Sequence, residues 1–273
     1  MKEKLEGKKQ EKELIEEEIE EICKKPEFRK LNRAFVLKIA LKIVQKFERF
    51  ERKDKNIKDY IKAVRKFLRK ILTPMQPKFY KKFKFFLDNI DKDEIIDAVI
   101  KANFAARERE KGYPWLIEFL AKTKPTQIID FGCGFNLLGL YKYGFDFSQC
   151  SYVGYDIDGY ITELLEKFAE KKKINAKIIN ADISSIDFTK FKESKTIYLF
   201  LKVLDALEAI EPGFSKKILM LGGTKIVSFS LRSLGGKRHL MERAWFENLL
   251  NENKIGYEKI KKGEELFYVF NVN

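Results

Sequence analysis

Apolar residues in the first hundred positions recur every three to four residues, which is the spacing of one face of an amphipathic helix. Such stripes run through residues 8–24, 31–50 and 60–71, and another at 93–104 begins with acidic residues that suit a helix N-terminus. The pattern therefore predicts an all-helical domain over residues 1–105. The aromatic residues near its end keep a helical spacing, so we expect them in a core and not on an RNA-stacking surface.

The pattern changes after residue 105, where short apolar runs rich in β-branched residues alternate with helical stripes. Strands are predicted at residues 128–130, 151–156, 176–179, 196–200 and 225–230. Helices are predicted at residues 115–121, 137–143, 159–172, 202–210, 214–220 and 238–251. Residues 105–114 are expected to connect the two halves, and a hairpin of residues 256–260 and 266–272 to end the fold. We therefore expect an α/β fold over residues 106–273, with a Rossmann-like sheet and an antiparallel C-terminal hairpin.

The chain of 273 residues has a formal net charge of +14, and this charge is concentrated in the helical half. Residues 24–84 hold 22 Lys and Arg against 5 Asp and Glu, so the rest of the chain is slightly acidic. A basic block favours structured RNA as a partner, through phosphate contacts and counterion release. The alternative is a lysine-rich solvated surface of the kind found in heat-adapted proteins. The residues expected to contact phosphate lie on the outward face of the third helix: Lys62, Arg65, Lys66 and Arg69.

Sparse cysteine and histidine argue against a metal site and against an oxidising compartment. The three cysteines are far apart and His239 is the one histidine, so no zinc-binding spacing exists. An odd cysteine count suits a reducing cytosol. No apolar run approaches the length of a membrane span, and the N-terminus does not resemble a signal peptide. We expect a monomeric cytoplasmic protein with no metal and no membrane association.

A glycine turn follows the first predicted strand of the second half. The strand ends at Asp130, and Gly132-Cys-Gly134 leads into a helix, an arrangement that lets the backbone approach a nucleotide-like ligand. Asp156 ends the next strand, where a carboxylate can bond ribose hydroxyls, and Asp182 follows the third, where one can meet an adenine amino group. Each acid could instead cap a helix, a role that suits Asp158 better than Asp156.

The turn does not match a dinucleotide or nucleoside-triphosphate site. The third glycine of the dinucleotide fingerprint is missing, and no Gly-Lys-Ser/Thr follows to hold phosphates. A ligand with ribose and adenine but no pyrophosphate fits these residues, and S-adenosylmethionine is such a cofactor.

Several segments of the sequence resemble a known protein family. In chain order they are Asp130-Phe-Gly-Cys-Gly-Phe-Asn136, Tyr155-Asp-Ile-Asp158, Ala181-Asp-Ile183, Leu201-Lys-Val-Leu-Asp-Ala-Leu-Glu208 and Ser228-Phe-Ser-Leu-Arg-Ser-Leu-Gly-Gly-Lys237. Together they resemble the aminoglycoside-resistance 16S ribosomal RNA guanine-N7 methyltransferases. The resemblance covers residues 105–273, and its last two motifs are the most specific, because other methyltransferases share the first three.

The resemblance implies a class I methyltransferase sheet and a role for each matched residue. It places an S-adenosylmethionine site at Arg109, Asp130, Gly132, Gly134, Asp156, Asp182 and Ile183, with Arg109 on the cofactor carboxylate. It places the target base and RNA near Lys202, Glu208, Ser228, Arg232 and Lys237. The sequence departs from the family pattern at Leu137, Asp205 and His239, which bears on the choice of nucleotide more than on the cofactor.

Guanine N7 has a free lone pair, so its methylation needs alignment and not a general base. The scarcity of histidine agrees with such a positioning mechanism without a catalytic acid or base. Covalent catalysis by Cys133 is an alternative, although a cysteine in a glycine turn normally faces the cofactor or core. The sequence therefore predicts a methyltransferase for guanine N7 of small-subunit rRNA near the decoding site. The same chemistry on tRNA, or a non-catalytic RNA-binding protein with this fold, are the alternatives.

Overall fold

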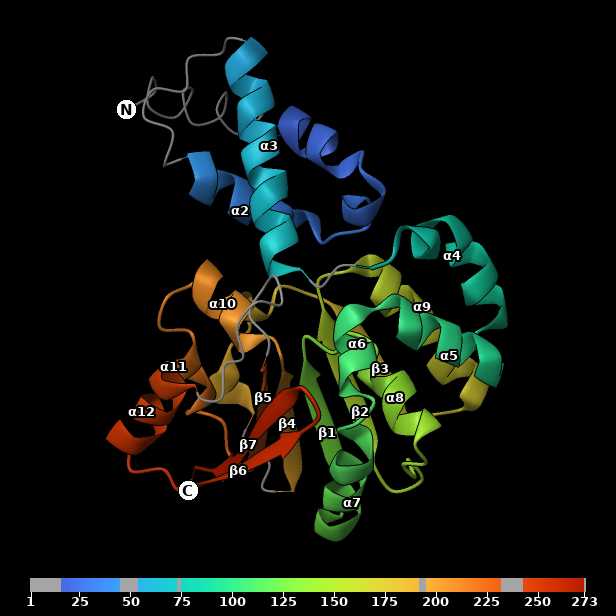
Figure 1. Ribbon diagram of the computed structural model, residues 1–273, viewed down its shortest axis with the longest axis vertical. Coiled ribbons are helices and arrows are strands. Elements are labelled where there is room, and N and C mark those ends of the chain that lie inside the picture. Colours follow the sequence, from blue (N-terminus) through green and yellow to red (C-terminus); the bar gives the residue numbers. More distant parts are fainter. Residues whose placement is uncertain (1–15, 45–53, 73–74, 192–194, 232–242, 273) are drawn as a thin grey trace.

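The computed structural model describes residues 16–44, 54–72, 75–191, 195–231 and 243–272. Its centre is one seven-stranded sheet in the order β3-β2-β1-β4-β5-β7-β6 (Figure 1). The strands are β1 (Gln127–Phe131), β2 (Ser151–Asp156), β3 (Ala176–Asn180), β4 (Thr196–Leu201), β5 (Thr224–Ser230), β6 (Tyr257–Lys262) and β7 (Glu265–Asn271). The first five are parallel and β7 runs antiparallel to both its neighbours, which confirms the predicted sheet and C-terminal hairpin.

Register places the carboxyl ends of the parallel strands at one edge of the sheet. Gln127 at the start of β1 pairs with Ser151 of β2 on one side and with Thr196 of β4 on the other. The chain order reverses at β1, whose neighbours are β2 and β4, and such a switch point is where open α/β sheets bind ligands. The acids that end successive strands are therefore brought together there.

Alternating side chains of the strands enter two different cores, one on each face of the sheet. Ile128 packs with helices α7 (Tyr113–Thr123), α8 (Asn136–Lys142) and α9 (Gly159–Lys172). Ile129 packs on the other face with α10 (Leu204–Ile210), α11 (Ser215–Ile218) and α12 (Ala244–Glu252). Because helices cover both faces of the sheet, the sequences of the central strands are mostly apolar at consecutive positions.

The helices before residue 105 divide between two cores. Residues 16–23, α2 (Arg33–Val44) and α3 (Asp54–Ile71) share a core of their own, and we call residues 16–44 and 54–72 the helical module. In contrast, α4 (Pro77–Asn89) and α5 (Asp93–Ala102) contribute to the same core as α8 and α9. The helical character of this region is confirmed for its described residues, whereas a domain boundary at residue 105 stays a prediction.

Most of the aromatic residues of α4 are buried, as predicted. Phe79, Phe83 and Phe86 face the core, and Phe79 and Phe83 pack against Tyr160 at the start of α9. Phe85 is the exception, with 53% of its surface exposed.

Two predicted helix boundaries were wrong, one because a side chain caps a new helix and the other because one residue has a left-handed backbone conformation. The helix predicted at 93–104 breaks at Asn103, whose side chain accepts a hydrogen bond from the Ala106 amide and begins α6 (Phe104–Arg109). The expected connection at 105–114 is consequently mostly helical. The helix predicted from residue 202 begins at Leu204 because Lys202 has a positive φ of 61°. The helix predicted from residue 238 begins at Ala244 in the described part of the chain, and residues 238–242 lie outside it.

Gly139 allows α8 to pack directly on the buried ring of Tyr113. A Cβ atom at this position would lie 2.0 Å from Tyr113 Cζ. We expect Gly139→Ala to lower the free energy of unfolding by about 1–3 kcal/mol, although alanine favours a helix, because the ring must shift in a packed core. Urea denaturation measures the change. Gly256→Ala is the control, since its Cβ would meet no atom within 4 Å, and equal stability of the two variants would contradict this packing.

Candidate cofactor and target site

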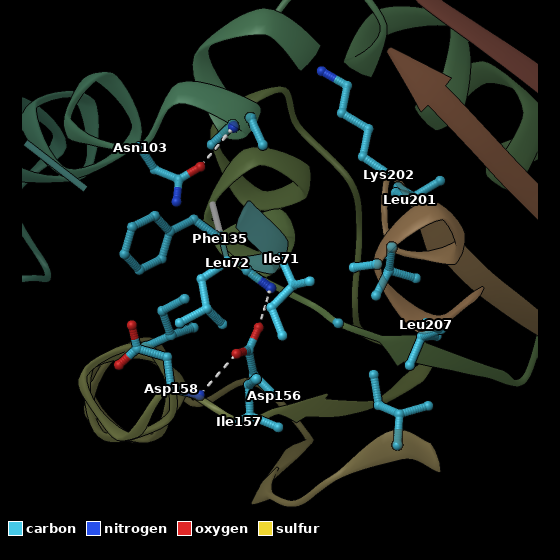
Figure 2. Close-up of a pocket in the computed structure, with 18 of the residues that line it drawn as sticks. Ile71, Leu72, Asn103, Phe135, Asp156, Ile157, Asp158, Leu201, Lys202 and Leu207 are labelled. Atoms are coloured by element: carbon cyan, nitrogen blue, oxygen red, sulfur yellow. Dashed lines mark hydrogen bonds between the residues drawn. The ribbon is translucent and has the colours of Figure 1, made fainter. Parts of the chain in front are cut away.

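A cavity lies at the carboxyl edge of the sheet where β1, β2 and β4 end (Figure 2). It encloses about 920 Å³ when the solvent space at its mouth is included. Seven of the residues singled out from the sequence line it: Arg109, Gly132, Gly134, Asp156, Asp182, Ile183 and Lys202. The structure thus brings together residues that are up to 93 positions apart in the sequence, from Arg109 to Lys202.

The glycine turn after β1 is fastened to the end of β2. The amides of Gly132 and Cys133 donate to the Tyr155 carbonyl, and the Gly134 amide donates to Asp156 Oδ2 at 2.9 Å. Gly132 and Gly134 have φ angles of 74° and 47°, which favour glycine. A Cβ at Gly132 would also lie 2.7 Å from Val203 Cγ2. Gly132 is therefore required for both backbone conformation and space, and Gly134 for backbone conformation alone.

Asp156 and Asp158 have different roles at the end of β2. Asp156 is 8% exposed, and its second oxygen accepts a hydrogen bond from the Asp158 amide at 2.9 Å (Figure 2). Burial raises the pKa of Asp156, and the backbone N–H groups around it partly offset this effect. Asp158 caps α9 by accepting from the Tyr160 amide, which confirms the capping interpretation for this residue. Burial and the nearby charge of Asp156 raise the pKa of Asp158 to about 7.

Asp182 anchors the helical module to the sheet. Its Oδ1 accepts from the amide and hydroxyl of Ser184, and its Oδ2 pairs with Lys38 of α2 at 3.1 Å. Burial alone would raise the pKa of Asp182, but the Ser184 and Lys38 hydrogen bonds bring it below its usual value. Asp182 therefore caps the short 3₁₀ turn at Ile183–Ser185 as well as lining the cavity.

A buried carboxylate that sequence reasoning missed lies behind the cavity. Glu265, at the start of β7, is fully buried and pairs with Arg109 Nε at 3.1 Å and with Lys202 Nζ at 3.3 Å. It also accepts a hydrogen bond from Ser228, which is buried too. Lys202 forms a second ion pair with Glu108 at 2.8 Å. Burial alone would raise the pKa of Glu265, but the charges of Arg109 and Lys202 keep it below its usual value.

Arg109 keeps one hydrogen-bonding nitrogen without a partner among the described residues. Its Nε binds Glu265, its Nη1 donates to Asn136 Oδ1, and its Nη2 is buried and unpaired. Leaving a buried guanidinium N–H group unsatisfied is costly, so a ligand acceptor is expected at this end of the cavity. A carboxylate is the acceptor that a guanidinium recognises best.

Asp130 does not line the cavity and instead positions Asn136. Its Oδ2 accepts from Asn136 Nδ2 at 2.8 Å and from the Tyr152 hydroxyl at 2.7 Å, and its side chain is fully buried. Asn136 in turn accepts from Arg109, so the acid acts on the cavity through an intermediate residue. Burial raises the pKa of Asp130 to about 6.

The remaining residues assigned to the target side are not in the cavity or are not described. Glu208 caps the loop after α10 by accepting from the amides of Gly213 and Ser215, and it does not line the cavity. Arg232 and Lys237 lie outside the described residues. Their roles, like those of the cavity residues, stay predictions at this point.

The four basic residues chosen on the third helix differ in how they are used. Arg65 donates to the carbonyls of Glu21 and Ile22, and Arg69 pairs with Glu27 at 2.8 Å. Both therefore hold the first part of the helical module onto α3. Lys62 and Lys66 are exposed and remain available for RNA phosphates.

Within the described part of the chain, no group of three or more His, Cys, Asp or Glu could hold a metal ion. Among those same residues, no helix is long and apolar enough to cross a membrane.

Cys133 is fully buried, and burial raises its pKa far above the usual value. This thiol is therefore a core residue and not a nucleophile.

The buried proton of Asp130 makes a pH-dependent contribution to stability. The folded chain holds it up to about pH 6, whereas the unfolded chain releases it near the ordinary value of 3.8. Stability from this group therefore falls as pH rises from about 4 to about 6. Because asparagine has no such proton, the stability of Asp130→Asn relative to the wild type should rise across this window in urea denaturation. Parallel pH profiles would contradict a raised pKa.

The Glu265 carboxylate should be essential for stability because the buried Arg109 and the half-buried Lys202 both pair with it. We expect Glu265→Gln to lower the free energy of unfolding by about 3 kcal/mol or more, since Arg109 and Lys202 lose their shared counter-charge. Glu118→Gln is the matched control, because that side chain is 63% exposed in its pair with Lys122 and should leave stability unchanged. Urea denaturation compares the two variants, and an unaffected Glu265→Gln would refute the ion cluster.

Comparison with solved structures supports the fold. The structure of the 16S rRNA methylase RmtB aligns with a TM-score of 0.73 at 22% identity, covering 95% of this chain and 98% of that one. The 16S rRNA methyltransferase RmtF, solved with S-adenosyl-L-homocysteine, has a TM-score of 0.75 at 18% identity, covering 94% and 98%. An rRNA methylase from Escherichia coli has a TM-score of 0.72 at 20% identity, covering 95% and 100%. At these identities the likeness concerns the fold alone.

Comparison of sequences identifies the family as well as the fold. A 16S rRNA (guanine(1405)-N(7))-methyltransferase of Serratia marcescens is 28% identical over 184 residues, which is 65% of this chain and 70% of the relative. The model of the ribosomal RNA methyltransferase (FmrO) family matches residues 95–269, well over half of the chain. The chain therefore belongs to the FmrO family of ribosomal RNA methyltransferases.

Proposed function

We propose that this protein transfers a methyl group from S-adenosylmethionine to N7 of a guanine in small-subunit rRNA, near the decoding site. The observation that carries the proposal is the cavity that Arg109 and Asp156 both line, together with the Arg109 Nη2 atom that has no hydrogen-bond partner among the described residues. Membership of the rRNA methyltransferase family gives the reaction class, and the Serratia relative suggests the guanine N7 position.

The residues that line the cavity fit S-adenosylmethionine. Arg109 would hold the carboxylate of its methionine part, and the turn at Gly132 and Gly134 would border that part closely. Asp156 would accept hydrogen bonds from the ribose hydroxyls. Ile183 is 4% exposed and would border the adenine, with Asp182 beside it. When bound, S-adenosylmethionine supplies a methyl group on a positively charged sulfur.

The side chains around the cavity support transfer by positioning. Among the described residues that line it there is no His, Cys or Ser that could act as a base or nucleophile. None is required, because guanine N7 carries a free lone pair. Glu108 and Glu265 balance the positive charges of Arg109 and Lys202. The carboxylate of Asp156 then contributes a negative charge to the cavity, and this charge favours a cationic ligand.

The target side is proposed to lie next to Lys202 and the segment that follows β5. Lys202 adopts a left-handed backbone conformation that costs about 1–2 kcal/mol, and its amide donates to the Ser228 carbonyl. Ser228, which lies in β5 shortly before Arg232 and Lys237 in the sequence, also donates a hydrogen bond to Glu265. We propose that these residues and Glu208 act on the RNA side, with Glu208 shaping the neighbouring loop.

The RNA partner is proposed to be the small ribosomal subunit or its rRNA. Exposed Lys62 and Lys66 would bind phosphates directly, whereas Arg65 and Arg69 would act by holding the helical module together. A ribosomal substrate also suits the expected cytoplasmic location. A monomer remains the expected oligomeric state.

Methyl transfer to defined substrates tests the proposal. The protein is incubated with labelled S-adenosylmethionine and either small ribosomal subunits or total tRNA, and the product is mapped by mass spectrometry. We expect 7-methylguanine in small-subunit rRNA, and none with Asp156→Ala, which should also abolish cofactor binding in calorimetry. Label in tRNA alone would overturn the substrate assignment. Cofactor binding without transfer to either RNA would instead indicate a non-catalytic RNA-binding protein.

A further inference from the structure

One wall of the cavity comes from the helical module and not from the α/β half. Phe35 of α2, Ile71 at the end of α3 and the adjacent Leu72 line the same cavity as Asp156 and Gly134. Figure 2 shows Ile71 and Leu72 among the labelled side chains that surround it. These apolar side chains belong to the part of the chain that also presents the exposed lysines of α3.

Backbone hydrogen bonds attach the start of α2 to the end of β2. The Asn32 amide donates to the Ile157 carbonyl at 2.9 Å, and the Gly159 amide donates to the Lys30 carbonyl at 2.8 Å. The Asn32 side chain donates to the backbone and side-chain oxygens of Asn180 at the end of β3. The segment next to Asp156 is thus shared between the helical module and the sheet.

A second attachment joins the C-terminal end of α2 to α10. Lys42 donates to the carbonyls of Ala209 and Ile210, at the C-terminal end of α10 where a cation is favoured. Ile210 contributes its side chain to the core of the helical module and also lines the cavity. Movement of the module away from the sheet would therefore break these contacts and remove part of the cavity wall.

We propose that the helical module is part of the cofactor site, so that cofactor binding and RNA docking strengthen each other. This inference rests on the proposed function, since it assumes that the cavity binds S-adenosylmethionine and that the module binds RNA. The cofactor makes its apolar contacts with Phe35, Ile71 and Leu72 only when the module is docked. RNA that binds the docked module stabilises the same arrangement, and linkage makes the effect reciprocal.

Two substitutions test the coupling without changing a side chain that lines the cavity. Lys42→Met removes the link to α10, and Asn32→Asp removes the donation to Asn180 while keeping an acceptor for the Phe35 amide that Asn32 caps. Lys167→Met is the control, because Lys167 pairs with Glu170 within α9. Circular dichroism verifies that each full-length variant is folded.

Calorimetry with S-adenosylhomocysteine measures cofactor affinity, and filter binding to small ribosomal subunits measures RNA affinity with and without that compound. We expect Lys42→Met and Asn32→Asp to weaken cofactor binding by about three- to tenfold, and Lys167→Met to leave it unchanged. We also expect the compound to tighten RNA binding by the wild type, and to do so less in the two docking variants.

Enlarging a wall residue tests the wall itself. Ile71→Trp should weaken cofactor binding by more than about tenfold because the indole takes space in the cavity, while RNA binding without cofactor is unchanged. Unchanged cofactor affinity in this variant would overturn the assignment of the wall. The coupling would be overturned if Lys42→Met and Asn32→Asp bound the cofactor as tightly as Lys167→Met. It would also be overturned if the RNA affinity of the wild type did not depend on the cofactor. A wild type that does not bind cofactor would instead refute the proposed function.

Discussion

The arrangement of the site depends on the buried carboxylate of Glu265. It pairs with both Arg109 of α6 and Lys202 after β4, and so supplies the counter-charge that lets these two cations lie close together with little solvent around them. Its position follows from topology, because β7 lies antiparallel beside β5 and pairs Glu265 with Ser230 at the carboxyl edge. The C-terminal hairpin therefore does more than complete the sheet, since it supplies the counter-charge for Arg109 and Lys202, which line the cavity.

A second constraint is that the cavity joins two cores. Its floor consists of strand ends and the glycine turn, which belong to the α/β half, and its outer wall belongs to the helical module. The contacts between them run from the end of β2 to the end of α10 and include the Lys38–Asp182 ion pair. In the proposed arrangement the cofactor touches both the sheet and the helical module, and RNA binds the module, so the binding of each ligand favours the binding of the other.

Much of the fold was predictable because its determinants are local. Period-two and period-3.6 patterns identified the strands and most helices, and the acids at strand ends identified the ligand-binding edge. Arg109 was reached through family resemblance, and the structure adds a physical reason for its importance in the unpaired Nη2. The break at Asn103 was missed because one capping side chain outweighed an apolar stripe that continues past it.

The parts that were not predicted depend on pairing between distant segments. Glu265 looks like an ordinary turn residue beside an apolar strand, and only the antiparallel register shows that it is buried against Arg109. Lys38 looks like one of many lysines on a solvated helix face, whereas it pairs with Asp182 across the edge of the sheet. No periodicity within one element contains this information.

A crystal structure with S-adenosylhomocysteine tests the central claim most directly. The account predicts the carboxylate of the compound within hydrogen-bonding distance of Arg109 Nη2, its ribose hydroxyls on Asp156, and its adenine between Ile183 and the wall formed by the helical module. A bound compound that leaves Arg109 Nη2 and Asp156 without contact would contradict the account.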